Sequence, residues 1–136
     1  MATRVGYITS RTAELGLGIA YVKNPMLLKY ITSALIGIEY ARYGTKDIFG
    51  PKLSLFYHKN FLILGPAIKL NMIYYLANPE HDIRIRPEIG LSFFGRFTIC
   101  YGKNFPLSSS NIKEIETDVL TVSLSLTLKK WEILQK

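Results

Sequence analysis

The chain has 136 residues, of which 49% are hydrophobic and 20% charged, and its formal net charge at pH 7 is +7. This length allows one domain with a substantial core, and no segment has the roughly 18 to 20 uninterrupted apolar residues of a transmembrane helix. The single cysteine, Cys100, excludes an intrachain disulfide and a cysteine-based zinc site. We expect one domain over residues 1–136, without a metal or another cofactor.

The alternation of large apolar residues with small or polar ones predicts eight strands. The first, residues 4–10, is the least regular. The others cover residues 14–22, 32–40, 50–58, 62–72, 83–94, 97–102 and 120–129. Most are about 9 to 11 residues long, which is the length that a tilted strand needs to cross the hydrocarbon core of a bilayer.

The predicted connections differ in length. Residues 58–61 and 94–95 suggest tight turns, residues 77–81 a longer link, and residues 105–116 the longest loop. Residues 23–28 do not fit this alternation, because a short turn is expected there. Residues 130–136 form a short tail after the last strand. Short turns on one rim and long loops on the other are typical of outer-membrane barrels.

The two faces of the predicted strands carry unlike residues. One face has large apolar side chains with few interruptions. The other has small residues, such as Gly16, Gly37 and Gly65, together with charges of both signs. The side chains of an eight-stranded barrel just fill its interior, and enclosed charges must be compensated, so this second face suits the inside of a closed barrel. The predicted lumen charge network consists of Glu39, Lys52, Lys69, Arg84, Arg86 and Glu88.

Tyrosines lie toward the ends of the apolar face, where the aromatic girdles of membrane barrels meet the two interfaces. The predicted girdle consists of Tyr21, Tyr40, Tyr57, Tyr74 and Tyr101. The predicted fold class is therefore all-β, a single antiparallel up-and-down β-barrel of about eight strands, of the transmembrane type with a polar interior. The alternative is a soluble lipocalin-like barrel whose apolar face lines a cavity for a small apolar ligand.

Three prolines, Pro51, Pro66 and Pro87, fall on the apolar face of predicted strands. A proline cannot donate a hydrogen bond to a neighbouring strand, and a closed barrel has no free edge on which to place it. We expect a bulge or a strand bend at each of these positions.

Few residues could carry out catalysis. Ser54 and His58 share the polar face of one predicted strand, and Glu39 could orient the histidine, which is the composition of a hydrolytic triad. We interpret both as lumen residues and expect that the chain is not an enzyme, with a lipid- or peptide-hydrolysing barrel as the alternative. His81 and its two acidic neighbours are expected in a solvated loop and not at a metal ion. The sequence has no HExxH, paired-cysteine or phosphate-binding glycine motif.

The positive net charge makes nucleic acid a partner to consider. A basic aromatic face like that of an OB fold could be built from Lys52, Lys69, Arg84, Arg86, Phe56, Tyr75 and Phe94. An OB fold has five strands, fewer than the number predicted for this chain. This alternative ranks third, behind the soluble ligand-binding barrel, and we expect no nucleic acid as a partner.

Two stretches, RPEIGLSFFG at residues 86–95 and YGKNFPL at residues 101–107, resemble small uncharacterised outer-membrane β-barrel proteins of the Bacteroidetes type. Residues 49–54, FGPKLS, are similar to an earlier strand of these proteins, and residues 121–126, TVSLSL, to their last strand. The resemblance covers most of the chain after residue 49, and its motifs are structural. The tail after the last strand departs from the family, whose chains usually stop at a strand with a terminal aromatic residue.

The pattern and the resemblance together suggest a bacterial outer-membrane protein with a structural, adhesive or surface-interaction role, a plugged polar lumen and no open pore. The expected partners are the lipid bilayer and lipopolysaccharide, and we expect a monomer. The rim lysines near lipopolysaccharide would be Lys103, Lys113, Lys129 and Lys130. The first residues, 1–4, lack the apolar core of a signal peptide, so a cytosolic location is expected if the chain is complete.

Overall fold

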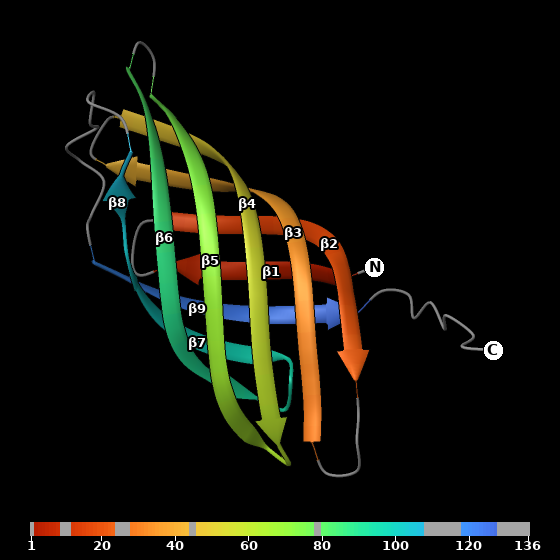
Figure 1. The fold of residues 1–136 in the computed structure, drawn as a ribbon. Coiled ribbons are helices and arrows are strands. Elements are labelled where there is room, and N and C mark those ends of the chain that lie inside the picture. The colour runs from red at the N-terminus through yellow and green to blue at the C-terminus, as the bar shows by residue number, and fades with distance from the viewer. Residues whose placement is uncertain are drawn as a thin grey trace.

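The computed structural model of the chain describes residues 2–8, 12–23, 28–43, 46–77, 80–107 and 118–127, nearly all of them in strands. The strands are β1 (Ala2–Ile8), β2 (Thr12–Lys23), β3 (Leu28–Tyr43), β4 (Lys46–Phe61), β5 (Leu64–Ala77), β6 (Glu80–Phe93), β7 (Phe97–Lys103), β8 (Phe105–Pro106) and β9 (Asp118–Thr127) (Figure 1). No helix that is long and apolar enough to cross a membrane occurs in the described ranges.

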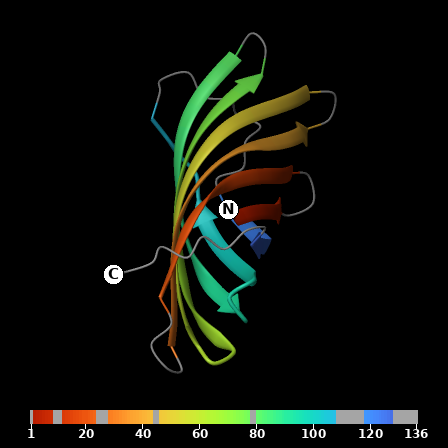
Figure 2. The same ribbon diagram turned by 90° about the vertical axis from the view of Figure 1, so that its right-hand side faces the viewer.

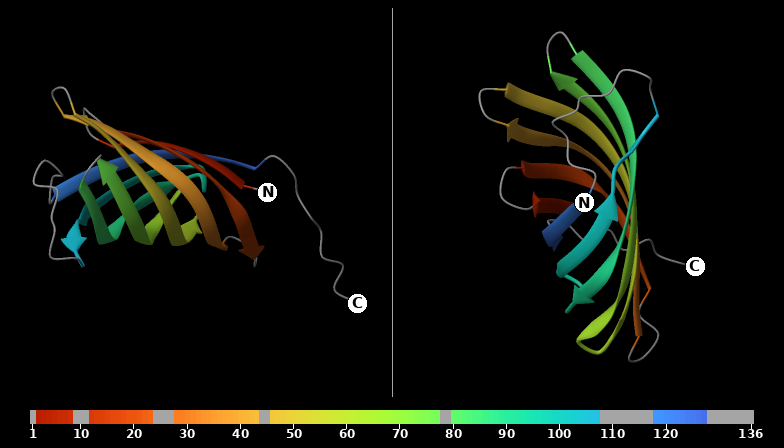
Figure 3. Two further views of the ribbon diagram at one scale, coloured as in Figure 1. Left: turned by 90° about the horizontal axis from the view of Figure 1, so that it is seen from above. Right: turned by 90° about the vertical axis from the view of Figure 1, so that its left-hand side faces the viewer.

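The strands pair in a closed ring. Each strand from β1 to β6 pairs antiparallel with the next one in the chain, and β9 pairs with both β7 and β1. The short β8 pairs with β6 in the same register as β7, so it prolongs β7 beyond Asn104. The long strands β3 to β6 form a tall wall, and the strands curve in one sense around a common interior (Figure 2, Figure 3). The predicted up-and-down barrel of about eight strands is confirmed.

The barrel has its polar residues inside and its large apolar residues outside. Along β5 every second residue from Gly65 to Ala77 is buried, and the residues between them are exposed. Lys69 is only 1% exposed, whereas its neighbour Ile68 is 57% exposed. Exposed aliphatic and aromatic side chains continue around the wall from β2 to β9. An apolar exterior of this extent suits lipid, so the alternative of a soluble barrel with an apolar cavity is wrong.

The two rims of the barrel differ. We call one the turn rim: it holds the start of β1, the end of β9, the end of β2, the start of β3 and the turns Leu62–Ile63 and Phe94–Arg96. The opposite rim, the loop rim, holds the ends of β1, β3, β5 and β8 and the starts of β2, β4, β6 and β9. This arrangement follows from the antiparallel order, because each strand reverses the direction of the one before it.

The predicted tight turn at residues 58–61 is wrong. The strand β4 continues to Phe61, and the turn lies at Leu62–Ile63 instead. His58 and Asn60 are buried on the inner face, whereas Lys59 between them is half-exposed. The polar composition of this stretch therefore reflects the alternation of a strand whose inner face is polar.

The link predicted at residues 77–81 is also shorter than expected. β6 begins at Glu80, so His81 and Asp82 are strand residues and not parts of a loop, and Asp82 is fully buried. Of the loop predicted at residues 105–116, Phe105 and Pro106 form β8. Residues 108–117 and the predicted tail, 130–136, lie outside the described residues.

The three prolines lie at gaps in the strand pairing and not at bulges. Among the described residues, the β4–β5 pairing skips Pro51 and Pro66, and the pairing of β6 with β7 and β8 skips Pro87. The register is the same on both sides of each gap, as the pairs Phe49–Leu76 and Lys52–Ile73 show on either side of Pro51. A proline removes a donor but adds no residue, so the strands lose hydrogen bonds without changing register. The expected bulges are therefore wrong.

Small residues on the inner face allow neighbouring strands to approach closely. A β-carbon at Gly18 would collide with main-chain atoms of Ala34 and Leu35 on β3, and one at Gly37 would collide with the carbonyl of Leu15 on β2. These glycines thus serve strand contact as well as the filling of a narrow interior.

Candidate functional site

The charged residues of the interior come from five consecutive strands. Glu14 lies on β2, Glu39 on β3 and Lys52 on β4, while β5 and β6 each contribute several polar residues. They point inward because each occupies the inner phase of its strand. The members of this interior network are Glu14, Glu39, Lys52, Lys69, Asn71, Tyr75, Arg86 and Glu88, all of them buried.

Arg86 forms one half of the interior network. Its two terminal nitrogens contact the two carboxylate oxygens of Glu39, at 2.6 Å (Nη2–Oε2) and 3.1 Å (Nη1–Oε1), and its Nε donates to Glu88 Oε1 at 2.9 Å. The hydroxyl of Tyr75 donates to Glu39 Oε1 at 2.7 Å. Such a two-pronged guanidinium–carboxylate contact is among the strongest polar interactions in proteins.

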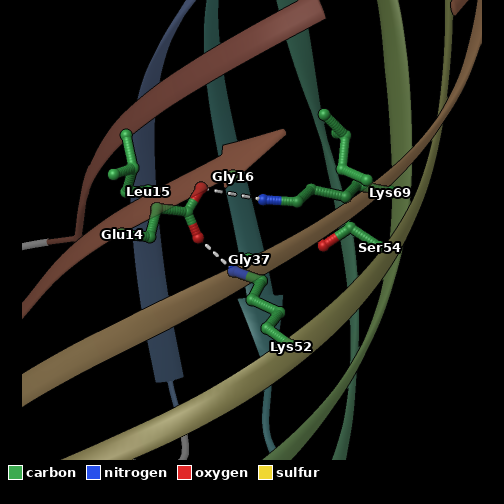
Figure 4. Close-up of a pocket in the computed structure, with 8 residues that line it drawn as sticks. Glu14, Leu15, Gly16, Gly37, Lys52, Ser54 and Lys69 are labelled. Carbon is green, nitrogen blue, oxygen red and sulfur yellow. Dashed lines mark hydrogen bonds and ion pairs between the residues drawn. The ribbon is translucent and has the colours of Figure 1, made fainter. Parts of the chain in front are cut away.

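Two lysines form the other half (Figure 4). Lys52 Nζ donates to Glu14 Oε2 and, at 3.2 Å, to Glu39 Oε2. Lys69 Nζ donates to Glu14 Oε1 at 3.2 Å and lies 3.9 Å from Glu88 Oε1. Glu14 and Glu39 are direct cross-strand partners, so Lys52, which donates to both carboxylates, offsets their mutual repulsion.

Asn71 joins the network to a serine. Its amide nitrogen donates to Glu88 Oε1 at 2.7 Å, and its carbonyl oxygen accepts a hydrogen bond from Ser54 at 2.7 Å. The three carboxylates of the network face three cations, Lys52, Lys69 and Arg86. Buried charges are tolerated only when they are paired and hydrogen-bonded; every carboxylate here is paired with a cation and accepts at least one hydrogen bond, while Glu88 Oε2 has no hydrogen-bond partner.

The structure brings together five of the six residues predicted for the lumen network. Arg84 pairs with Asp82, with its Nε 2.8 Å from Asp82 Oδ2. Sequence reasoning missed Glu14, although Glu14 shares the inner phase of its strand with Gly16 and Gly18, and that phase was the available signal. The basic face considered for nucleic acid is wrong, because its four cations are buried in the interior.

Apolar residues fill the interior on both sides of the network. Ala41, Ile48, Ile73, Tyr75 and Ala77 pack together toward the loop rim. Phe56, Ala67 and Cys100 form a second cluster on the other side. A cavity of about 20 Å³ remains beside Glu14, Lys52 and Lys69, which is room for about one water molecule. The side chains of the network and of the two clusters thus occupy the described lumen around this cavity.

The five tyrosines predicted for the girdle all lie on the outer face. Tyr21 and Tyr57, which are 62% and 42% exposed, lie toward the turn rim. Tyr40, Tyr74 and Tyr101 lie toward the loop rim. There the hydroxyls of Tyr40 and Tyr101 donate to Asp47 at 2.7 Å and to Asp118 at 2.6 Å. Aromatic rings with one polar end suit the boundary between lipid and water.

Ser54 and His58 do not form a catalytic pair. They are four residues apart on one extended strand, a separation of about 13 Å between their α-carbons. Ser54 donates to Asn71, and the ring of His58 packs edge-on against Phe56, with 4.8 Å between ring centroids. Within the described residues no group of three or more His, Cys, Asp or Glu side chains could hold a metal ion.

No protein-family model matches the chain. No curated protein matches its sequence either. The resemblance to Bacteroidetes barrels therefore stays a prediction. Among solved structures, the crystal structure of the outer membrane enzyme PagL is similar over 93% of this chain and 98% of that chain, with a TM-score of 0.56 and 12% sequence identity.

This match corrects one prediction. The sequence analysis expected that the chain is not an enzyme, but the same architecture belongs to an outer membrane enzyme. A barrel fold with a plugged lumen is therefore no reason to exclude enzymatic activity. The likeness is one of fold, and it agrees with the polar interior, the apolar outer wall and the outward tyrosines. The chain has the fold of an outer-membrane β-barrel.

Proposed function

We propose that the chain resides in the outer membrane of a Gram-negative bacterium, conducts no solute through its lumen, and acts through its outer wall and rims. Its role is a surface interaction with partners in or beside the membrane. The observation that carries this proposal is the set of side chains inside the barrel, where buried ion pairs and two apolar clusters surround a cavity of about 20 Å³. A solute path needs an open lumen, which barrels of this size lack.

The test is reconstitution of the chain into planar lipid bilayers. Folding is first checked by gel mobility, since a folded barrel in detergent migrates differently from the same sample after heating. The expected conductance equals that of a protein-free bilayer, with a porin as the positive control. Stable open channels from the folded chain would contradict the plugged lumen. A folded monomer that stays soluble without detergent would contradict the membrane location.

A further inference from the structure

The interior does not account for the net charge of +7. The described interior holds four cations, Lys52, Lys69, Arg84 and Arg86, and four anions, Glu14, Glu39, Asp82 and Glu88. These eight charges cancel, so the described buried charges of the interior contribute no net charge.

The loop rim is balanced as well. Its charged residues with described side chains are Arg42, Asp47, Lys103 and Asp118. Two exposed ion pairs join them: Arg42 Nε lies 3.7 Å from Asp47 Oδ1, and Lys103 Nζ lies 3.8 Å from Asp118 Oδ1. Basic and acidic residues are equal in number at this rim. Lys103, expected beside lipopolysaccharide, is thus paired within the chain.

The turn rim is basic. Its residues with described side chains include Lys23, Lys59 and Arg96, and no acidic residue. Lys23 pairs across the strands with Tyr30, and Tyr30 pairs with Lys59, so these three residues form one row across β2, β3 and β4. The ammonium of Lys59 lies 5.3 Å from the centre of the Tyr30 ring. Tyrosine flanked by lysines is typical of a membrane interface.

The sequence that follows β9 extends this bias. β9 ends at the turn rim with Thr127, and the nine residues after it contain Lys129, Lys130 and Lys136 but one acid, Glu132. The positive excess of the chain is therefore concentrated toward this rim and the segment that leaves it.

The turns at this rim are apolar. Leu62, Ile63 and Phe94 are 62%, 55% and 65% exposed, and the two turns are joined by a 2.7 Å hydrogen bond from the Phe94 N–H to the Ile63 carbonyl. Leu62 and Phe94 have φ angles of 57° and 53°, in the left-handed region that favours Gly and Asn. The geometry of the turns thus does not explain these large apolar side chains. Side chains held at such backbone angles point to a function at the rim.

We infer that the turn rim binds the head groups of anionic phospholipids. The lysines and Arg96 meet the phosphates, and the apolar turns reach the boundary of the acyl chains. A basic rim with apolar tips matches such a surface in both charge and polarity, and each Lys or Arg beside an anionic membrane contributes about 1 kcal/mol. This inference rests on the proposed membrane location.

The experiment uses the folded chain in phosphatidylcholine vesicles that contain spin-labelled phosphatidylglycerol or spin-labelled phosphatidylcholine. Electron paramagnetic resonance gives the fraction of each lipid that the protein restricts, and hence the preference for the anionic head group. The expected preference is at least about fivefold, the factor for one Lys or Arg beside an anionic surface, and it falls as salt is raised.

Two triple variants locate the preference. Lys23→Gln/Lys59→Gln/Arg96→Gln is expected to lose most of it, whereas the matched loop-rim variant Arg42→Gln/Lys46→Gln/Lys103→Gln keeps it. Equal restriction of both lipids by the unaltered chain would overturn the inference. An equal loss of the preference for phosphatidylglycerol in both variants would overturn it too. So would the finding that free glycerol phosphate competes for the rim as well as the phosphatidylglycerol does. Gel mobility of each vesicle sample reports barrel folding independently, so a failure of the membrane location is distinguishable from a failure of lipid selectivity.

Discussion

Arg86 is the residue on which the interior contacts converge. It is fully buried, and it links Glu39 on β3 with Glu88 on its own strand. The desolvation of such a guanidinium costs several kcal/mol, which its two carboxylate partners must offset. The removal of Arg86 would leave two buried carboxylates without their shared cation.

We therefore predict that Arg86→Met destabilises the barrel by about 3 to 5 kcal/mol, the range for a buried ion pair that loses one partner. The measurement is urea unfolding in lipid vesicles, followed by gel mobility. The double variant Arg86→Met/Glu39→Gln should recover part of the loss, because it removes a positive and a negative charge together.

The control is Arg42→Met, which breaks the exposed pair with Asp47 at the loop rim. Exposed ion pairs contribute about 0 to 1 kcal/mol, so this variant should unfold almost as the unaltered chain does. Equal losses for the two arginines would mean that the interior network does not hold the barrel together.

Residue phase predicted six of the buried charges, but it missed Glu14 and Asp82 and did not predict which pairs form. Glu39, Lys52 and Arg86 were placed by counting alternate residues from the apolar ones. Their pairing depends on cross-strand register, such as that of Glu14 with Glu39, which no local pattern in the sequence encodes. For the same reason the pair Arg84–Asp82 was not foreseen, since Asp82 was assigned to a loop.

At the scale of elements, the alternation located the strands but misplaced their ends. Periodicity is strongest where one face is lipid-facing, as in β5. Near the rims, residue composition predicted the wrong kind of element twice. The polar stretch 58–60 was predicted as a turn but belongs to β4, and the apolar residues Leu62 and Ile63 were predicted as strand but form a turn. A strand with a polar inner face looks like a loop, and an apolar turn looks like a strand.

A charge on the outer face of β5 should be costly at mid-strand and tolerated at its end. Ile68→Arg, at a position that is 57% exposed, is predicted to reduce the free energy of unfolding in vesicles by about 2 to 4 kcal/mol. Leu76→Arg on the same face, one residue before the strand ends, should cost about 0 to 1 kcal/mol. If Ile68→Arg were as mild as Leu76→Arg, Ile68 would face water and not lipid.

At the scale of the whole molecule, ring closure determines what each face meets. The pairing of β9 with β1 and β7 leaves no open sheet edge on either strand, and encloses the charged network. Enclosure requires buried charges to be compensated, and the described buried charges are balanced, while much of the positive excess lies at the turn rim and in the sequence after β9. Small residues and charges of both signs on one face of the strands predicted that this face is enclosed in a barrel. Which charged residues share a rim could not be predicted in the same way, because it depends on the order and direction of the strands.

The central claim, that apolar residues face lipid and polar residues face the interior, is most directly tested by a cysteine scan of β5 in a Cys100→Ser background. Single cysteines from Leu64 to Ala77 carry a spin label in vesicles, and access of oxygen is compared with access of a water-soluble nickel complex. We predict a period of two, with lipid-dissolved oxygen reaching residues 64, 66, 68, 70, 72, 74 and 76. The inverse phase, or an unvarying profile along β5, would contradict the claim.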